Sequence, residues 1–276
     1  MSTYIYPKLS NRDYGFVRVG GNGLANCMFI AAWAAIEKDR IGEDAILLRP
    51  TWERLGLGQF LRREKDKRFY AGLFRCESFW KTLKKLWIIK AAKNIKVCEW
   101  ERKYFEPIWP KADVARQYFQ REILPEAIAR VPLRMKTSIA VHVRLGDFPQ
   151  EYRTPIDWYR KRIEEAIAAS EGGRLDFQLF SDGTDEELEP LIKLPGVHRA
   201  FYGNALADII AISRCGFLIG SDSTFSCWGA FLGNVPAVFN HLIDCPPHQD
   251  TEMYAVIDED GSLPKKFVEL IKHLGD

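Results

Sequence analysis

Hydrophobic and polar positions in the second half of the chain predict strands and helices in alternation. Apolar runs of about four to eight residues indicate buried strands, and apolar residues spaced three and four apart indicate amphipathic helices. The expected strands are 139–145, 177–181, 199–202, 217–220 and 236–240. The expected helices are 154–170 with Thr154 as cap, a short acidic helix from Asp185, 205–215, 224–233 and 263–274 with Ser262 as cap. Repeated alternation of this kind predicts a parallel sheet covered by helices.

The first half begins with a similar pattern. A short strand is expected at 16–19, followed by the glycine-rich turn 20–23, a helix over 26–39 and a strand over 45–48. A boundary near residues 131–132 then divides the chain into two α/β domains, 1–131 and 132–276, with a cleft between them. The first domain contains a basic, aromatic and helical insertion at about 61–105.

Composition limits the classes of protein to consider. The chain has 276 residues, 47% of them hydrophobic, and a net charge of +2, so its overall charge does not indicate nucleic-acid binding. Its six cysteines show no CxxC spacing, and scattered single cysteines are typical of a reducing compartment. We see neither a signal peptide nor an apolar run of about 18 residues. These features predict a cytoplasmic protein, with peripheral contact at the inner face of the membrane as a separate hypothesis.

That membrane hypothesis rests on the basic insertion. Residues 61–103 hold fourteen Lys and Arg against five Asp and Glu, a net charge of +9. The stretch KTLKKLWIIKAAKNIK resembles a basic amphipathic helix that could lie on an anionic bilayer. The alternative is a helix of the acceptor domain with its aromatic side chains packed inward and its lysines solvated, and the pattern favours this alternative.

Candidate chemistry begins at the end of the strand 139–145. Side chains alternate along a strand, so Ile139, Val141, Val143 and Leu145 share one face, whereas His142 and Arg144 share the other with Ala140. Open α/β sheets bind ligands at the carboxyl ends of their strands, and a guanidinium fork suits phosphate oxygens. The alternative is a histidine satisfied in the core and an arginine paired with a carboxylate.

Two further strand ends carry polar groups. Ser223 and Thr224 open a helix just after a strand that ends at Gly220, so hydroxyls, free N–H groups and the helix dipole converge there. They form either a phosphate cradle or an ordinary helix cap. Asp182 follows the strand 177–181, where its carboxylate could accept the N1–H and N2–H of guanine, hold a ribose, or close an Asx turn.

Two other sequences are weaker candidates. The turn 20–23 lets backbone amides approach a ligand, but it lacks the third glycine of a dinucleotide fingerprint, and Asn26 could simply cap the next helix. Residues 258–260 read Asp-Glu-Asp, formally the DxD pattern of metal-dependent sugar transferases, but Gly261 and Ser262 follow, so we interpret them as a turn.

Taken together, these motifs resemble one family, the α-1,2-fucosyltransferases of glycosyltransferase family 11. Residues 23–29, GLANCMF, resemble the family's GLGNQMF, and residues 141–147, VHVRLGD, resemble its HVRRGD. Residues 180–182 match its FSDD, and ALAD at 205–208 followed by STFSCWGA at 223–230 resembles ALEDL and NSTFSWWGAW. The motifs keep the family's order from residue 20 to about 240.

The resemblance implies a GT-B fold of two Rossmann-like domains with the donor and acceptor in the cleft between them. It implies GDP-fucose as donor, an oligosaccharide or lipid-linked glycan as acceptor, inversion at the anomeric carbon and no metal or other cofactor. Arg144 would be the catalytic residue, contacting the diphosphate and stabilising the departing GDP. The other implied binding residues are Ser223, Thr224 and Phe225 at the phosphates, His142 and Asp182 at the nucleotide, and Gly23 and Asn26 on the donor side of the cleft.

Several positions depart from the family motifs. Leu145 stands where the family has a second arginine and Gly183 where it has a second aspartate. Ala25, Cys27 and Cys227 replace a glycine, a glutamine and a tryptophan. The expected function is transfer of fucose, α-1,2 to galactose in a cell-surface polysaccharide. The alternatives are another GDP-sugar or linkage, or a catalytically silent protein that binds a nucleotide sugar or glycan.

Overall fold

The computed structural model describes residues 2–55, 70–146, 149–241 and 245–274. The chain divides into two compact units, Met1–Ala129 and Arg130–Asp276, called here the N-terminal and C-terminal units. The first part of the basic insertion, 61–69, lies outside the described residues. Within the described ranges, no helix has both the length and the apolar character needed to cross a membrane.

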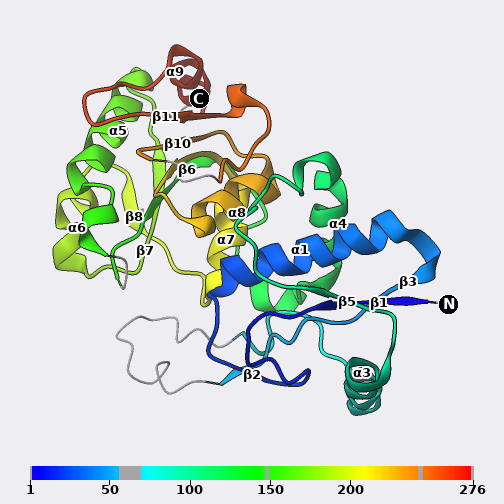
Figure 1. Ribbon diagram of the computed structural model, residues 1–276. Helices are drawn as coiled ribbons and strands as arrows, with labels where there is room; N and C mark the ends of the chain where they lie inside the picture. Colours follow the sequence, from blue (N-terminus) through cyan, green and yellow to red (C-terminus); the bar gives the residue numbers. More distant parts are fainter. Residues whose placement is uncertain (1, 56–69, 147–148, 242–244, 275–276) are drawn as a thin grey trace. The chain divides into compact units, whose positions relative to one another are not determined.

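The C-terminal unit is built on a six-stranded parallel sheet in the order β11-β10-β9-β6-β7-β8 (Figure 1). Its strands are β6 (Met135–Val143), β7 (Asp176–Ser181), β8 (Val197–Arg199), β9 (Cys215–Gly220), β10 (Ala237–Phe239) and β11 (Tyr254–Val256). The chain runs outward from β6 to β8 on one side and from β9 to β11 on the other. This reversal makes the carboxyl ends of β6 and β9 the topological switch point, where such sheets bind ligands.

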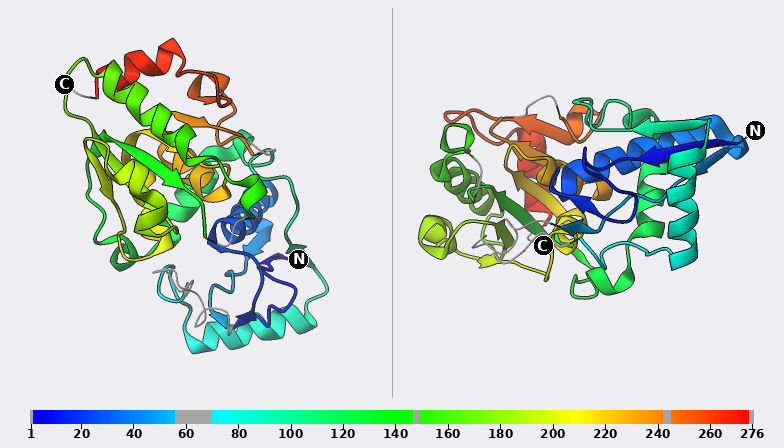
Figure 2. Two further views of the ribbon diagram at one scale, coloured as in Figure 1. Left: turned by 90° about the vertical axis from the view of Figure 1, so that its left-hand side faces the viewer. Right: turned by 60° about the horizontal axis from the view of Figure 1, so that its bottom comes forward.

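Helices cover both faces of this sheet (Figures 1 and 2). One layer consists of α5 (Ile156–Ala169), α6 (Asp185–Ile192) and α9 (Lys265–Lys272), and the other of α7 (Ala205–Arg214) and α8 (Thr224–Gly233). Ile139, Val141, Val143 and Leu145 belong to the buried core under the first layer, as their alternation predicts. The expectation of a parallel sheet covered by helices is therefore confirmed.

Several element boundaries differ from the sequence-based expectations. Helix α9 begins at Lys265 after Pro264, and α5 begins at Ile156 after Pro155, so neither Ser262 nor Thr154 is a helix cap. A residue that precedes proline is disfavoured in helical conformation, and this delays both helices. Strand β8 lies two residues before the expected strand 199–202, and the three-residue β11 was not expected.

The N-terminal unit has a three-stranded parallel sheet in the order β3-β1-β5. Helix α1 (Leu24–Ile41) packs on one face, where Ala34 contacts Ile5, and helix α3 (Phe79–Ala91) packs on the other, where Ile88 contacts Tyr6 (Figure 1). Helix α4 (Ala112–Glu122) packs against α1. The strands are β1 (Thr3–Pro7), β3 (Ala45–Leu47) and β5 (Ile95–Cys98); the sequence analysis anticipated only β3. The remaining short elements are the 3-10 helices Gly42–Asp44, Trp109–Lys111, Pro125–Ile128, Gln150–Tyr152 and Thr251–Met253.

The glycine-rich turn follows a strand of a separate, two-stranded sheet. Strand β2 (Arg18–Val19) pairs in parallel with β4 (Arg54–Leu55), and the turn connects β2 to α1. Gly23 is the residue that caps α1, so Asn26 lies inside the first turn of the helix and the alternative in which Asn26 caps it is wrong. The hydroxyl of Tyr70 accepts the N–H of Leu24 at 2.9 Å, which satisfies one of the unpaired donors at this helix end.

Candidate functional site

An arginine–aspartate pair lies at the carboxyl edge of the C-terminal sheet. Arg144 follows β6 and Asp182 follows β7, and the guanidinium Nη1 donates to Asp182 Oδ2. The other carboxylate oxygen accepts the backbone N–H of Leu145 at 2.8 Å. A Cβ at position 146 would collide with this carboxylate, so Gly146 allows the two strand ends to meet. Asp182 therefore fixes the direction of a guanidinium whose side chain is still 24% exposed.

Two further arginines hold the backbone around this pair. Arg199, at the end of β8, donates through Nη2 to the carbonyls of Ser181 (3.1 Å) and Gly183 (2.9 Å), on either side of Asp182. Arg153 donates to the carbonyl of Gly146 at 3.1 Å. The sequence analysis did not single out either residue, because neither stands in one of the motifs at the strand ends and both act through backbone carbonyls.

His142 is buried and makes contacts with the segment that follows β9. Its ring stacks on Phe225 with centroids 4.7 Å apart, and Nδ1 lies 2.7 Å from Ser226 Oγ and 2.9 Å from Ser221 Oγ. Burial lowers the pKa of His142 to about 4, so the imidazole is neutral at pH 7. The histidine thereby ties β6 to the start of α8, and its place at the nucleotide stays a prediction.

The turn between β9 and α8 has the arrangement expected of a helix cap. Ser223 Oγ accepts the N–H of Phe225 at 3.2 Å, and α8 begins at Thr224. Ser223, Thr224 and Phe225 are each only partly buried. The start of the ten-residue helix α8 thus lies at the switch point, where free N–H groups favour an anion. The phosphate contact of these residues stays a prediction.

Sequence reasoning missed three polar residues that support the switch point. Ser221 and Ser226 are 3% and 0% exposed and both contact the His142 ring. Tyr159 of α5 is 1% exposed, and burial raises the pKa of its hydroxyl, which lies near Ser221. One signal was available: Ser226 stands three residues after the cap Ser223, a spacing that returns it to the sheet side of the helix.

The glycine-rich turn of the N-terminal unit is shaped by a buried arginine. Arg18 is fully buried and donates through Nη1 to the carbonyls of Gly20 (2.8 Å) and Asn22 (3.4 Å). Gly20 and Gly21 have positive φ angles of 64° and 80°, and a Cβ at Gly21 would collide with Ser10. The turn therefore needs glycine for its backbone conformation and for close packing.

A cavity of about 620 Å³ opens beside this turn, at the carboxyl ends of β1 and β5. It combines an indole, that of Trp100, with the side chains of Asn11 and Arg12 and with an ion pair of 2.7 Å between Lys8 and Glu99. Concave sites that pair an aromatic surface with a few polar groups are typical binding sites for small polar molecules. Gly23 and Asn26 are not among its lining residues.

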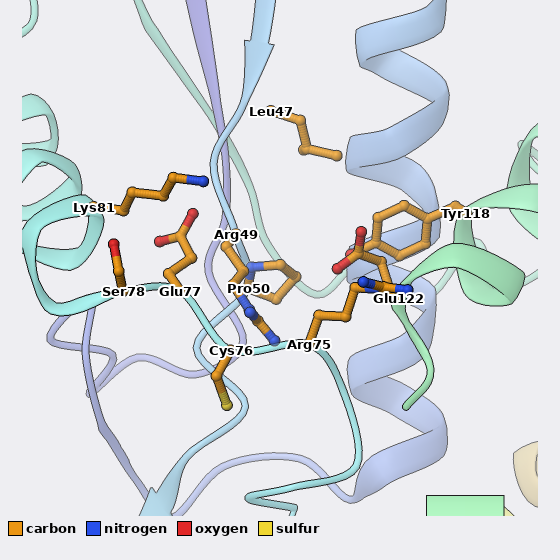
Figure 3. Close-up of a pocket in the computed structure, with 10 residues that line it drawn as sticks. All are labelled: Leu47, Arg49, Pro50, Arg75, Cys76, Glu77, Ser78, Lys81, Tyr118 and Glu122. Atoms are coloured by element: carbon orange, nitrogen blue, oxygen red, sulfur yellow. The ribbon is translucent and has the colours of Figure 1, made fainter. Parts of the chain in front are cut away.

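A second cavity in the N-terminal unit, of about 320 Å³, lies beside β3, the start of α3 and the end of α4 (Figure 3). Its cations Arg49, Arg75 and Lys81 are interspersed with Glu77 and Glu122. None of the predicted site residues lines it. The mixed charges give no preference for an anion, and we assign it no role.

Three carboxylate candidates have local partners or lie outside the described residues. Asp13 stands near the glycine-rich turn, accepts the backbone N–H groups of Leu9 (3.1 Å) and Gly15 (2.9 Å) and so organises its own loop. Asp147, which ends the VHVRLGD sequence, lies outside the described residues. Asp258 accepts the N–H of Gly261 at 2.7 Å, so the interpretation of the DxD sequence as a turn is confirmed. In the described part of the chain, no three His, Cys, Asp or Glu residues are grouped as metal ligands.

The two departures from the family motifs at the switch point are in contact with each other. Leu145 is 6% exposed and belongs to the core under α5, as its strand face predicts. A Cβ at Gly183 would collide with the Leu145 side chain. An apolar contact therefore stands where the family motif, as quoted above, has an arginine and an aspartate.

Comparison with known proteins shows the class of fold first. Two similar structures are "NodZ alpha-1,6-fucosyltransferase co-crystallized with GDP", at 15% identity and a TM-score of 0.54 over 90% of this chain and 97% of that chain, and "fucosyltransferase NodZ from Bradyrhizobium", at 14% identity and 0.53 over 89% and 100%. This chain thus has the GT-B fold, a mixed α/β fold with parallel sheets, and the predicted fold class is confirmed.

A comparison with models of protein families matches a shorter part of the chain. Residues 110–243 match the model of Glycosyl transferase family 11, and the resemblance is confirmed over this range. The range includes Arg144, Asp182 and the start of α8 but excludes Gly23 and Asn26. No curated protein matches the chain.

Proposed function

We propose that this protein transfers L-fucose from GDP-fucose to a hydroxyl of a glycan, with inversion at the anomeric carbon and an α-1,2 linkage to galactose. The observation that carries the proposal is the partly exposed Arg144, fixed by Asp182 at the switch point of a family 11 domain. A guanidinium whose direction is already fixed can stabilise leaving-group charge without reorganisation during the reaction.

The proposed mechanism assigns one step to each group. The acceptor oxygen attacks the anomeric carbon opposite GDP and releases its proton to solvent, while the bond from that carbon to the β-phosphate oxygen breaks. The electron pair of that bond leaves with GDP, and Arg144 stabilises the charge that develops there. Ser223, Thr224 and Phe225 hold phosphate through hydroxyls and N–H groups at the start of α8.

Asp182 receives a more specific role than the sequence alone suggested. One oxygen already accepts from Arg144 and the other from the Leu145 N–H, so we propose that Asp182 positions Arg144 as well as seating the nucleotide. His142 contributes as a neutral ring that holds Phe225 in place. Gly23 and Asn26 remain proposed contacts from the N-terminal unit.

For the acceptor we propose the cavity at the carboxyl ends of β1 and β5. Its indole and polar side chains suit a sugar, which presents both apolar C–H faces and hydroxyl groups. The linkage rests on the motif resemblance alone, since the structurally similar NodZ is described as an α-1,6-fucosyltransferase. Product linkage analysis with galactose-terminated acceptors would distinguish the two linkages.

The first experiment is thermal unfolding with excess GDP, UDP, ADP or CDP, each with and without EDTA. A ligand at about 100 Kd stabilises the folded state by about 2.7 kcal/mol, enough to shift Tm visibly. We expect a shift with GDP that EDTA does not change, because the proposed site uses arginine and N–H groups and no metal. Absence of a GDP shift, or a larger UDP shift that requires metal, would overturn the proposal.

Donor assays would distinguish the proposed function from its two alternatives, a transferase for another GDP-sugar or linkage and a catalytically silent binding protein. The loss of the second arginine at Leu145 is the observation that favours them, since it removes one cation from the family motif. Faster transfer from another GDP-sugar would indicate a different donor. Binding of GDP-fucose without hydrolysis or transfer over a broad acceptor panel would indicate a silent binding protein.

A further inference from the structure

Four large apolar side chains are exposed on the outer side of helix α3. Phe79, Trp80, Leu83 and Trp87 are 70%, 76%, 41% and 68% exposed. Trp80, Leu83 and Trp87 stand at positions i, i+3 and i+7, so they form a continuous stripe along the helix. The sequence-based preference for aromatic side chains packed inward on this helix is therefore wrong.

The opposite side of α3 explains why the aromatic residues face outward. Ile88 is 3% exposed and packs on Tyr6 of β1 and on Leu48, the residue after β3. Lys85 is 5% exposed, donates to Thr51 Oγ1 at 3.2 Å and lies over the Tyr6 ring at 5.8 Å. These residues fix the helix to the sheet, so the exposed stripe contributes little to the fold of this unit.

Positive charge surrounds the stripe. Lys84 and Lys90 are exposed and, at 100° per residue, flank the stripe on its two sides, while Lys81 is exposed at the start of the helix. The sequence of α3 contains no Asp or Glu. Among the described residues, these three lysines make no ion pair.

This combination distinguishes between two kinds of partner. Protein interfaces are enriched in aromatic residues but depleted of lysine, particularly at their centres. At a membrane surface, tryptophan rings lie at the level of the head groups, and lysines extend their charged ends to lipid phosphates. We propose that α3 docks this protein on an anionic phospholipid surface, with Trp80 and Trp87 in the interface and Lys84 and Lys90 at the head groups.

The test is co-sedimentation of the full chain with sucrose-loaded vesicles at low salt. Mixed phosphatidylcholine and phosphatidylserine vesicles should pellet the protein, and pure phosphatidylcholine vesicles should pellet much less. Each lysine near an anionic surface contributes about fivefold to the partition coefficient. We therefore expect K84E/K90E to weaken partitioning by at least about 25-fold and W80A/W87A by at least about tenfold.

Two controls separate this effect from general changes of charge or fold. K193E/K265E makes the same change of charge on exposed lysines of the C-terminal unit and should leave partitioning nearly unchanged. W80A/W87A should keep the wild-type Tm, because both rings are exposed. Transfer to a soluble acceptor, if the proposed function holds, should also be unchanged in that variant, whereas vesicle binding does not depend on the proposed function.

Three results would overturn the proposal. The wild-type protein could fail to pellet with anionic vesicles at low salt. The W80A/W87A variant could pellet with anionic vesicles as well as the wild-type protein does, which would exclude α3 as the docking element. Sedimentation equilibrium could instead show a dimer that W80A/W87A abolishes without any vesicle binding, and the stripe would then be a protein interface.

Discussion

The switch point of the C-terminal unit and the glycine-rich turn of the N-terminal unit are both backbone turns after parallel strands, but they are fixed in different ways. At the switch point, side chains from neighbouring strands hold the turns, as Asp182 holds Arg144 and Arg199 holds the carbonyls beside it. At the glycine-rich turn, Arg18 and Arg54 donate to backbone carbonyls, and the absence of side chains allows the turn to pack closely. The first arrangement depends on an ion pair between two side chains, and the second depends on space that only glycine leaves free.

Removal of charge at the switch point should have the largest effect. Arg144→Ala should lower kcat/KM by at least about 100-fold, the scale of one lost preorganised donor, while circular dichroism and Tm report a retained fold. Arg160→Ala, which removes an exposed arginine on α5 instead, is the matched control and should keep wild-type turnover. Near-normal turnover of Arg144→Ala would remove this residue from the mechanism.

Addition of a methyl group to the glycine-rich turn should test whether this turn depends on the space that glycine leaves free. Gly21→Ala should lower the free energy of unfolding by about 2 to 3 kcal/mol, because its positive φ is strained and its Cβ meets Ser10. Gly20→Ala has positive φ but open space around it, so it should cost only about 1 kcal/mol. Urea denaturation measures both values, and equal costs would show that packing against Ser10 has no influence.

The buried histidine predicts how stability at the switch point depends on pH. The pKa of His142 is about 4 in the folded protein against 6.5 for the unfolded side chain, so the unfolded state binds more protons between these values. The stabilising contribution is complete above about pH 6.5 and is lost as the pH falls toward 4, by about 2 kcal/mol at pH 5.

Urea denaturation at pH 7 and pH 5 would measure this contribution. His142→Gln keeps a polar partner for Ser221 and Ser226 but does not titrate, so its stability should fall less between the two pH values than that of the wild type. His198→Gln, at an exposed histidine, should fall as much as the wild type. An unchanged pH dependence in His142→Gln would contradict a neutral, buried imidazole.

The smallest expected effect is at Leu145 and Gly183, two positions that depart from the family motif and lie in contact with each other. Leu145→Arg places a cation in the core and Gly183→Asp places a side chain against Leu145, so each should destabilise alone. The double variant restores a charged pair, and we expect it to be about 1 kcal/mol more stable than the two single effects predict. A double-mutant cycle by urea denaturation measures this coupling; strict additivity would show that the two positions act independently.

Much of the C-terminal sheet was readable from the sequence, because strand and helix patterns alternate there and β6, β7 and β9 end in polar motifs. Alternation alone assigned Leu145 to the core and His142 to the other face, and the structure confirms both. In the N-terminal unit the same approach missed the central strand β1, and it attached the glycine-rich turn to an ordinary strand although β2 belongs to a separate two-stranded sheet. The partners of these strands lie far away in the sequence.

The sequence by itself determined the parallel α/β architecture, the face of each side chain on β6 and the motifs at the strand ends, because these follow from local periodicity and residue type. Only the tertiary structure decided which charges meet: that Asp182 holds Arg144, that Arg18 fills the glycine-rich turn, and that Lys85 rather than Trp80 or Trp87 faces inward on α3. Such pairings depend on sheet order and helix rotation, which arise from contacts among residues distant in the chain.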